Sequence, residues 1–164
     1  MQIYIASDHA GFELKNFLAV FLRQRGETIE DMGPSIYIEG DDYPDYCIPV
    51  AQKVAQNKGS FGIVIGGSGQ GEAMAANRIK GVRAMVYYGM PKQNFSAVPQ
   101  NRSESSAQAL DVIKLSREHN DANVLSLGAR FVSSEEARAV VELFLSTPFS
   151  NEERHVRRIA KLDA

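Results

Sequence analysis

Short apolar runs alternate with longer amphipathic stretches along almost the whole chain, and this alternation restricts the fold more than any other feature. The runs that predict buried strands are Ile3–Ala6, Phe61–Ile65, Val82–Tyr87 and Val124–Leu127, with a further short strand at Thr28–Asp31. Amphipathic stretches between and after them predict helices at 12–25, 44–57, 72–78, 107–117, 134–145 and 151–161. Strands that alternate with helices indicate an α/β fold, with a mostly parallel sheet and helices on both faces.

The length predicts a single domain over residues 1–164. One segment, 89–106, departs from the pattern, because it is rich in Pro, Asn, Gln and Ser and has no clear period. A stretch of this kind inside a small domain is unusual. We interpret it as an inserted loop, which is either a lid over a substrate or a tolerated surface insertion.

The charge balance excludes several classes of partner. Eighteen basic and twenty acidic side chains give a net charge of −2, which argues against a nucleic-acid or anionic-membrane surface as the main partner. The only cysteine, Cys47, excludes an internal disulfide. The N-terminus has no basic leader and no apolar run approaches the roughly 18 residues that span a bilayer, so we expect a cytoplasmic protein. The three histidines show no spacing typical of a metal site.

The sequence Gly66-Gly67-Ser68-Gly69-Gln70-Gly71 follows the third strand directly and leads into a helix. Gly67, Gly69 and Gly71 let the backbone turn sharply and expose successive N–H groups, and the helix N-terminus adds partial positive charge. This combination is typical of an anion site, for a phosphate or for an oxyanion that develops during a reaction. The alternative is a tight turn without a ligand.

Three familiar glycine-rich motifs do not fit this turn. The spacing is G-x-G-x-G rather than the G-x-G-x-x-G of dinucleotide-binding folds. A P-loop requires a Gly-Lys-Ser/Thr sequence that is missing here. A nucleophile elbow around Ser68 would require glycine where Gln70 stands. What remains is an anion-binding turn with a hydroxyl, Ser68, and a carboxylate, Glu72, which is either a general base or an acidic residue favoured by the helix dipole.

Other candidate residues lie in separate parts of the chain. Asp8 and His9 follow the first strand and are predicted to face the same crevice as the glycine turn. The alternative is that Asp8 is only a helix N-cap and His9 a polar loop residue. Arg130 follows the fifth strand, where an arginine can bind phosphate through two hydrogen bonds. The candidates that do not follow a strand are His119 and Asn120, before the fifth strand, and Arg154 and Arg158, which share one face of the last helix or form a solvated basic surface.

Taken together, the motifs resemble one family, the type B ribose-5-phosphate isomerases with the related galactose-6-phosphate isomerase subunits. The resemblance covers nearly the whole chain. It rests on motifs in a fixed order: Ser7-Asp8-His9-Ala10-Gly11-Phe12 with Leu14-Lys15, Asp42-Tyr43-Pro44, Gly66 to Glu72, Ala75-Ala76-Asn77-Arg78, Ser116 to Asp121, and Glu153-Arg154-His155 with Arg157-Arg158.

This resemblance implies a three-layer α/β/α sandwich around a five-stranded, parallel, Rossmann-like sheet. It also implies a homodimer, in some members a dimer of dimers or tetramer, in which the C-terminal helix packs on the partner subunit and the active sites are shared. No metal and no organic cofactor are expected. The reaction it implies moves a proton between C1 and C2 of an open-chain sugar phosphate, interconverting ribose 5-phosphate and ribulose 5-phosphate through an enediol(ate).

Residue roles follow from the same resemblance. Many members use a cysteine at the end of the third strand as the base, but that position is Gly66 here. Members without the cysteine place a glutamate at the start of the next helix, so Glu72 is predicted to be the base. Further roles are predicted for residues that stabilise the enediolate (Ser68, Gly67, Gly69, Gln70, Gly71), open the ring (His119 with Asp8), hold a sugar oxygen (Asn120), line the pocket (Tyr43) and bind phosphate (His9, Arg130, Arg154, Arg158).

The stretch between Gly89 and Ser116 is longer than the family pattern and precedes His119, which leaves the substrate open. The alternatives are galactose 6-phosphate, allose 6-phosphate or a tetrose phosphate. A different class of alternative is a non-catalytic sugar-phosphate-binding subunit.

Overall fold

Five parallel strands form a single sheet in the order β2-β1-β3-β5-β4. The structure is a computed structural model that describes residues 1–89 and 105–163, with the backbone alone for 105–111. The strands are β1 (Gln2–Ser7), β2 (Thr28–Asp31), β3 (Phe61–Gly66), β4 (Ala84–Tyr87) and β5 (Val124–Gly128). The predicted parallel five-stranded sheet is therefore confirmed.

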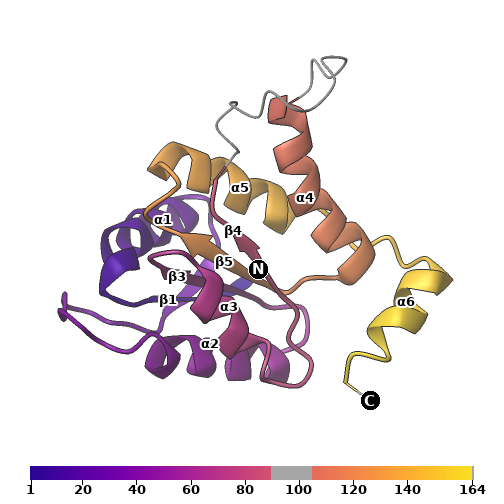
Figure 1. Cartoon of the computed structure of the whole chain (residues 1–164), viewed down its shortest axis with the longest axis horizontal. Helices are drawn as coiled ribbons and strands as arrows, with labels where there is room; N and C mark the ends of the chain where they lie inside the picture. Colours follow the sequence, from indigo (N-terminus) through magenta and orange to yellow (C-terminus); the bar gives the residue numbers. More distant parts are fainter. Residues whose placement is uncertain (90–104, 164) are drawn as a thin grey trace, which may run out of the picture.

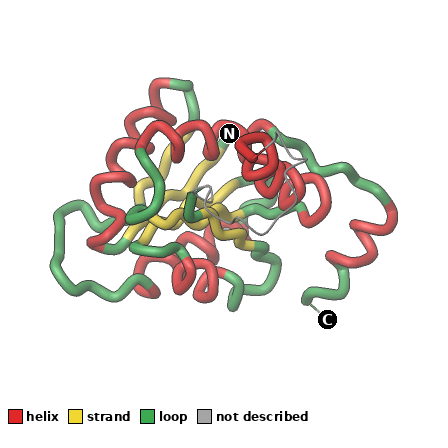
Figure 2. Tube along the Cα trace, turned by 45° about the horizontal axis from the view of Figure 1, so that its top comes forward, coloured by secondary structure: helices red, strands yellow, loops and turns green. Residues whose placement is uncertain are grey.

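Helices cover both faces of this sheet (Figures 1 and 2). One face carries α1 (Phe12–Gln24), α4 (Ser105–Asn120) and α5 (Ser134–Ser146), and the other carries α2 (Pro44–Gln56) and α3 (Gln70–Ala76). The last helix, α6 (Glu153–Ile159), stands at the side of the molecule near the end of α4 (Figure 1). No helix in the described ranges is long and apolar enough to cross a membrane.

Successive side chains of each strand point to opposite faces of the sheet, so the hydrophobic core consists of two layers. In β1, Ile3 and Ile5 join the cluster under α1 and α5, whereas Tyr4 and Ala6 join the cluster under α2 and α3. Because both faces are covered, β3 is apolar at almost every position, as expected for a central parallel strand.

The order of the strands creates a crevice at the carboxyl edge of the sheet. The connection that leaves β1 goes to β2 on one side, whereas the connection that leaves β3 goes to β4 on the other side, beyond β5. The chain therefore leaves the neighbouring ends of β1 and β3 in opposite directions. Ligands of open α/β sheets bind at such a switch point. The residues that follow β1 and β3 are Asp8 and Gly67, at the points where the sequence analysis placed candidate residues.

Element boundaries differ from the sequence prediction in two places. The strand expected from Val82 begins at Ala84, because the backbone N–H of Arg83 donates to the Asn123 side chain instead of to a strand. Helix α4 begins before the predicted residue 107 and continues to Asn120. The predicted inserted loop, 89–106, lies largely outside the described residues.

Candidate active site

The glycine-rich turn joins β3 to α3 and places Glu72 in the first turn of that helix. Gly69 has a φ of 78°, a left-handed conformation that glycine adopts without strain. A β-carbon there would also lie 3.0 Å from the backbone of Leu127. Two features fix the turn on β5: the Ser126 hydroxyl donates to the Gly69 carbonyl at 2.6 Å, and the Arg130 N–H donates to Gly67.

Glu72 is buried, with 4% of its surface exposed. Burial raises the pKa of its carboxyl group, and the negative charge of Asp8 raises it further, whereas a hydrogen bond from the backbone of Glu72 itself acts in the opposite direction. A buried carboxylate with a raised pKa has gained basicity, which is the property that a proton-transferring base requires.

Gly66 and Gly71 lie so close to the side chains of Glu72 and Tyr43 that only glycine fits at either position. A β-carbon at position 66 would overlap the Glu72 carboxylate, so glycine at this position makes room for the glutamate. A β-carbon on Gly71 would lie 2.7 Å from Cζ of Tyr43, so the tyrosine ring packs directly on the turn. Tyr43, which precedes α2, thereby reaches the glycine turn, as predicted for a residue that lines the pocket.

The residues after β1 form the second wall of the crevice. Asp8 is buried, and its side chain accepts hydrogen bonds from the N–H groups of Ala10 and Gly11, so Asp8 is an N-cap, and its part in ring opening stays a prediction. It caps a short 3-10 helix, His9–Gly11, that packs on β3 so closely that a β-carbon on Gly11 would collide with the Ile65 carbonyl.

Arg130 completes this end of the sheet. Its guanidinium lies against Gly67, 3.2 Å from where a β-carbon would stand, and its positive charge acts on His9. Ser68 lies exposed at the tip of the turn, where its hydroxyl accepts the N–H of Gln70 at 3.3 Å. One crevice therefore gathers a buried carboxylate, a hydroxyl, the start of a helix, an imidazole and a guanidinium.

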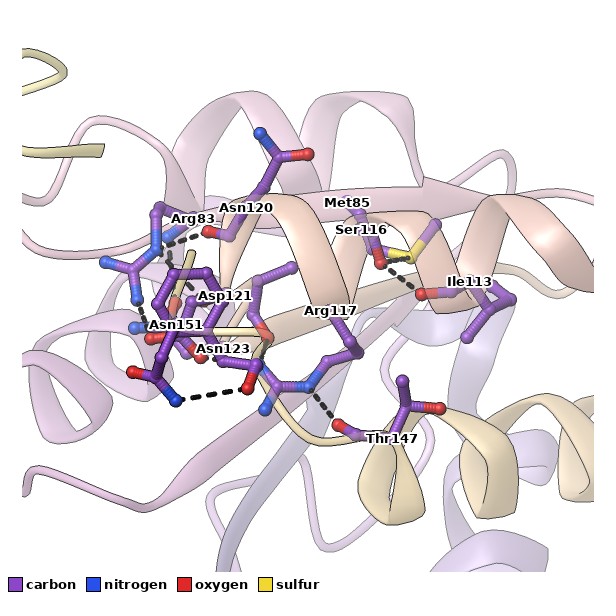
Figure 3. Close-up of polar contacts among 12 residues, drawn as sticks. Arg83, Met85, Ile113, Ser116, Arg117, Asn120, Asp121, Asn123, Thr147 and Asn151 are labelled. Atoms are coloured by element: carbon purple, nitrogen blue, oxygen red, sulfur yellow. Dashed lines mark hydrogen bonds and ion pairs between the residues drawn. The ribbon is translucent and has the colours of Figure 1, made fainter. Parts of the chain in front are cut away.

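His119 and Asn120 lie at the opposite edge of the same sheet. They are the last residues of α4, close to the start of β5. Strand β5 runs from there to Gly128, which pairs with Gly66 beside the turn that carries Glu72. At a rise near 3.3 Å per residue the strand is about 13 Å long, which separates the two groups. Figure 3 shows how the turn after α4 is held. Arg83 donates to the carbonyl of Asn120 at 2.8 Å, and Arg83 and Arg117 each donate at 2.9 Å to one oxygen of Asp121.

The last helix is attached at this same edge. The rings of His119 and His155 lie 4.3 Å apart between centroids, and Nδ1 of His155 lies 2.9 Å from the Ser150 hydroxyl. Burial lowers the pKa of His155, and the neighbouring His119 adds to this effect, so the neutral imidazole is favoured. Arg154 and Arg158 are both exposed on α6.

Several known proteins resemble this chain over nearly its whole length. A model of the ribose/galactose isomerase family matches residues 3–103 and 105–162. The ribose-5-phosphate isomerase B of Mycolicibacterium paratuberculosis is 38% identical over 97% of this chain and 87% of its own length. The chain belongs to the ribose/galactose isomerase family.

Further relatives match this chain over almost their whole length. A probable ribose-5-phosphate isomerase B of Mycoplasma pneumoniae is 40% identical, with 99% of this chain and 93% of the relative covered. The crystal structure of ribose-5-phosphate isomerase B from Mycoplasma genitalium with bound ribulose-5-phosphate superimposes with a TM-score of 0.82, at 36% identity, over 98% of this chain and 93% of the other.

In this member of the ribose/galactose isomerase family, the predicted site residues lie in two separate places. The structure brings together those at the carboxyl edge of the sheet: Asp8, His9, Tyr43, Gly67, Ser68, Gly69, Gln70, Gly71, Glu72 and Arg130. It does not bring His119, Asn120, Arg154 and Arg158 to them within one chain. In the part of the chain that the structure describes, no three His, Cys, Asp or Glu side chains lie where they could hold a metal ion together.

Sequence reasoning missed three polar residues in and beneath these two places. Asp41 contacts His9, Lys15 is buried and bonds the loop after β2, and Arg83 holds the turn after α4. Their partners are distant in sequence, so no spacing could have indicated them. The motif Leu14-Lys15 marked Lys15 only as part of a resemblance.

Proposed function

We propose that this chain is an aldose–ketose isomerase that interconverts ribose 5-phosphate and ribulose 5-phosphate, with Glu72 as the base. The observation that carries the proposal is the buried Glu72 carboxylate in the first turn of α3, directly after the glycine turn. The names of the relatives and the ribulose-5-phosphate bound in the Mycoplasma genitalium structure support the choice of substrate.

The chemistry follows from the arrangement at the carboxyl edge. Glu72 takes the proton from C2 of the open-chain aldose, and the electron pair moves to form a C1–C2 double bond with negative charge on O1. Ser68 and the N–H groups around Gly67–Gly71 are suited to stabilise this oxyanion. Glu72 then returns the proton to C1 while the proton on O2 is transferred to O1, which gives the ketose without any change in the total number of atoms or electrons.

Ring opening and much of the phosphate binding require residues from the other edge of the sheet. His119 and Asn120 can meet Asp8 and Glu72 only if a second chain supplies them, because β5 separates the two groups within one chain. We therefore propose a homodimer in which each site combines the carboxyl edge of one subunit with the α4–α6 region of its partner. A two-fold interface would complete two identical sites at once.

The test is isomerisation of ribose 5-phosphate by the purified protein in EDTA, compared with Glu72→Gln. The wild-type protein is expected to turn over, and Glu72→Gln to lose about 10²–10⁴-fold in kcat, the contribution typical of a general base. The matched control is Glu135→Gln, an exposed glutamate in the first turn of α5, which should keep full activity. An inactive wild type would refute the substrate, and a panel of tetrose and hexose phosphates would then show whether an isomerase activity exists.

A further inference from the structure

His9 makes two contacts with a single carboxylate oxygen. Its backbone N–H donates to Oδ1 of Asp41 at 2.8 Å, and its ring Nδ1 lies 2.7 Å from the same oxygen. Only 6% of the surface of the Asp41 side chain is exposed, and its second oxygen, Oδ2, is buried as well. Two contacts to one oxygen fix both the backbone and the ring of His9.

The segment that carries Asp41 is held in place at its start. Lys15 is buried with 1% of its surface exposed, and its ammonium group donates to both oxygens of Asp31, at 2.8 and 2.9 Å, and to the carbonyl of Pro34 at 3.0 Å. The Ser7 N–H donates to the Gly33 carbonyl at 3.1 Å. Asp41 is therefore presented to His9 by a loop that is bonded to both α1 and the end of β1.

Several charged or titratable groups surround His9. Asp41 comes from the loop before α2, Asp8 from its own short helix, and Arg130 from the turn after β5. The ring of Tyr37 meets the imidazole edge-on at 6.4 Å between centroids. The hydrogen bond to Asp41 is the largest influence and raises the pKa of His9, Asp8 adds to the rise, and partial burial and Arg130 oppose it.

The contact with Asp41 determines what His9 can offer to a ligand. A carboxylate accepts, so Nδ1 carries a hydrogen and donates to it. In the neutral imidazole the other nitrogen, Nε2, then has a lone pair and repels a phosphate oxygen. Only the imidazolium presents an Nε2–H donor with a positive charge.

We propose that Asp41 is a positioning residue for phosphate recognition: it orients the His9 imidazole and stabilises its charged form, so that Nε2–H binds the phosphate of the substrate. This inference rests on the proposed function, because it takes the phosphate group of a sugar phosphate as the ligand. Arg130, whose guanidinium lies against Gly67 and acts electrostatically on His9, supplies the second positive charge. Asp41 itself touches no substrate.

The decisive variant is Asp41→Asn, which keeps an accepting oxygen for the Nδ1–H and the backbone N–H but removes the negative charge. The pKa of His9 should fall, and KM should rise by about tenfold, as expected when a hydrogen bond to a charged group is weakened. The ratio of KM between variant and wild type should peak between the two pKa values of His9 and approach one on either side. Since the phosphate of the substrate titrates identically in both, it cancels from this ratio, and kcat should not change.

A merely structural role for Asp41 would give a KM ratio that is the same at every pH, and that result would overturn the proposal. The matched control is Glu39→Gln, which removes one negative charge from an exposed position in the same loop and should leave KM unchanged. A second background addresses misfolding: in His9→Gln, adding Asp41→Asn should change KM no further. An additional loss there would show that Asp41 acts without His9.

A measurement without substrate separates this inference from the proposed function. NMR titration of the three histidines, with His9→Gln as the assignment standard, should give a lower His9 pKa in Asp41→Asn than in the wild type. Inorganic phosphate should shift the His9 signals of the wild type more strongly than those of Asp41→Asn. An unchanged His9 pKa, or no response to phosphate, would refute the inference even in an active isomerase, whereas both expected results would support it even if ribose 5-phosphate were not turned over.

Discussion

Gly66, the last residue of β3, lies so close to Glu72 that any β-carbon at position 66 would overlap the glutamate carboxylate. The two positions are therefore alternatives in space. A cysteine at the end of the strand and a glutamate in this conformation cannot both be present. The resemblance to the isomerase family already linked the missing cysteine to Glu72, and the structure gives a steric reason for that link.

This relationship predicts that Gly66→Ala lowers turnover with little loss of stability. The colliding atoms belong to the end of a flexible side chain, which can move, but the movement displaces the base. A displacement of about 1 Å can cost on the order of 10²-fold in rate. Steady-state kinetics and urea unfolding of the same preparation would measure the two effects.

The double variant Gly66→Ala/Glu72→Gln provides the control. If the alanine acts through Glu72, it should reduce activity in the wild type but not in the Glu72→Gln background, a non-additive result. Equal losses in both backgrounds would mean that Gly66 acts through the backbone of the turn.

Burial of Glu72 also predicts a specific dependence of stability on pH. Its pKa is raised in the folded protein, so the folded state binds more protons than the unfolded state between about pH 4.5 and that raised value. The Glu72 contribution to stability is therefore lost as pH rises through this window. Glu72→Gln, which has no charge to lose, should gain stability relative to wild type between pH 4 and pH 7 in urea unfolding. A difference between the two that is independent of pH would contradict the raised pKa.

The sheet and the place of Glu72 were predictable from sequence because their signals are local. The apolar run of β3 and the glycines after it directly specify a strand, a turn and a helix start. The partners of His9 and Asp121 were not predictable, since Asp41 and Arg83 lie 32 and 38 residues away and nothing in their spacing marks a contact. His119 and Asp8 were predicted to act together from the family resemblance, which does not say which subunit supplies each residue, and within one chain they lie at opposite ends of the strands.

Arg83 and Arg117 both bind Asp121, and we expect the stability of the folded protein to depend on the buried one, Arg117. Arg117 is buried and donates to Asp121, Ala122 and Thr147. Arg117→Met keeps its apolar length but leaves two buried carbonyls and a carboxylate oxygen short of donors, and should cost about 2–4 kcal/mol. Arg138→Met, at an exposed ion pair on α5, should cost less than about 1 kcal/mol. Urea unfolding at one protein concentration would compare them, and equal values would contradict the assigned role.

The separation of Glu72 from His119 within one chain predicts complementation between two inactive variants. In a two-fold dimer with shared sites, each site takes Glu72 from one subunit and His119 from the other. A heterodimer of Glu72→Gln with His119→Asn then has one site with both substitutions and one fully intact site. It should show about half the wild-type activity per dimer, although each homodimer is inactive.

The heterodimer can be isolated with a different affinity tag on each subunit, and its ribose 5-phosphate isomerisation compared with that of the two homodimers. The control is a heterodimer of Glu72→Gln with Asp8→Asn, two substitutions on the same edge of the sheet. If Asp8 is required, each of its sites should carry one substitution, so it should stay inactive. Activity in the first pair but not in the second requires that His119 reaches Glu72 from the partner subunit. An inactive first pair would mean that His119 and Glu72 do not serve one site across the interface.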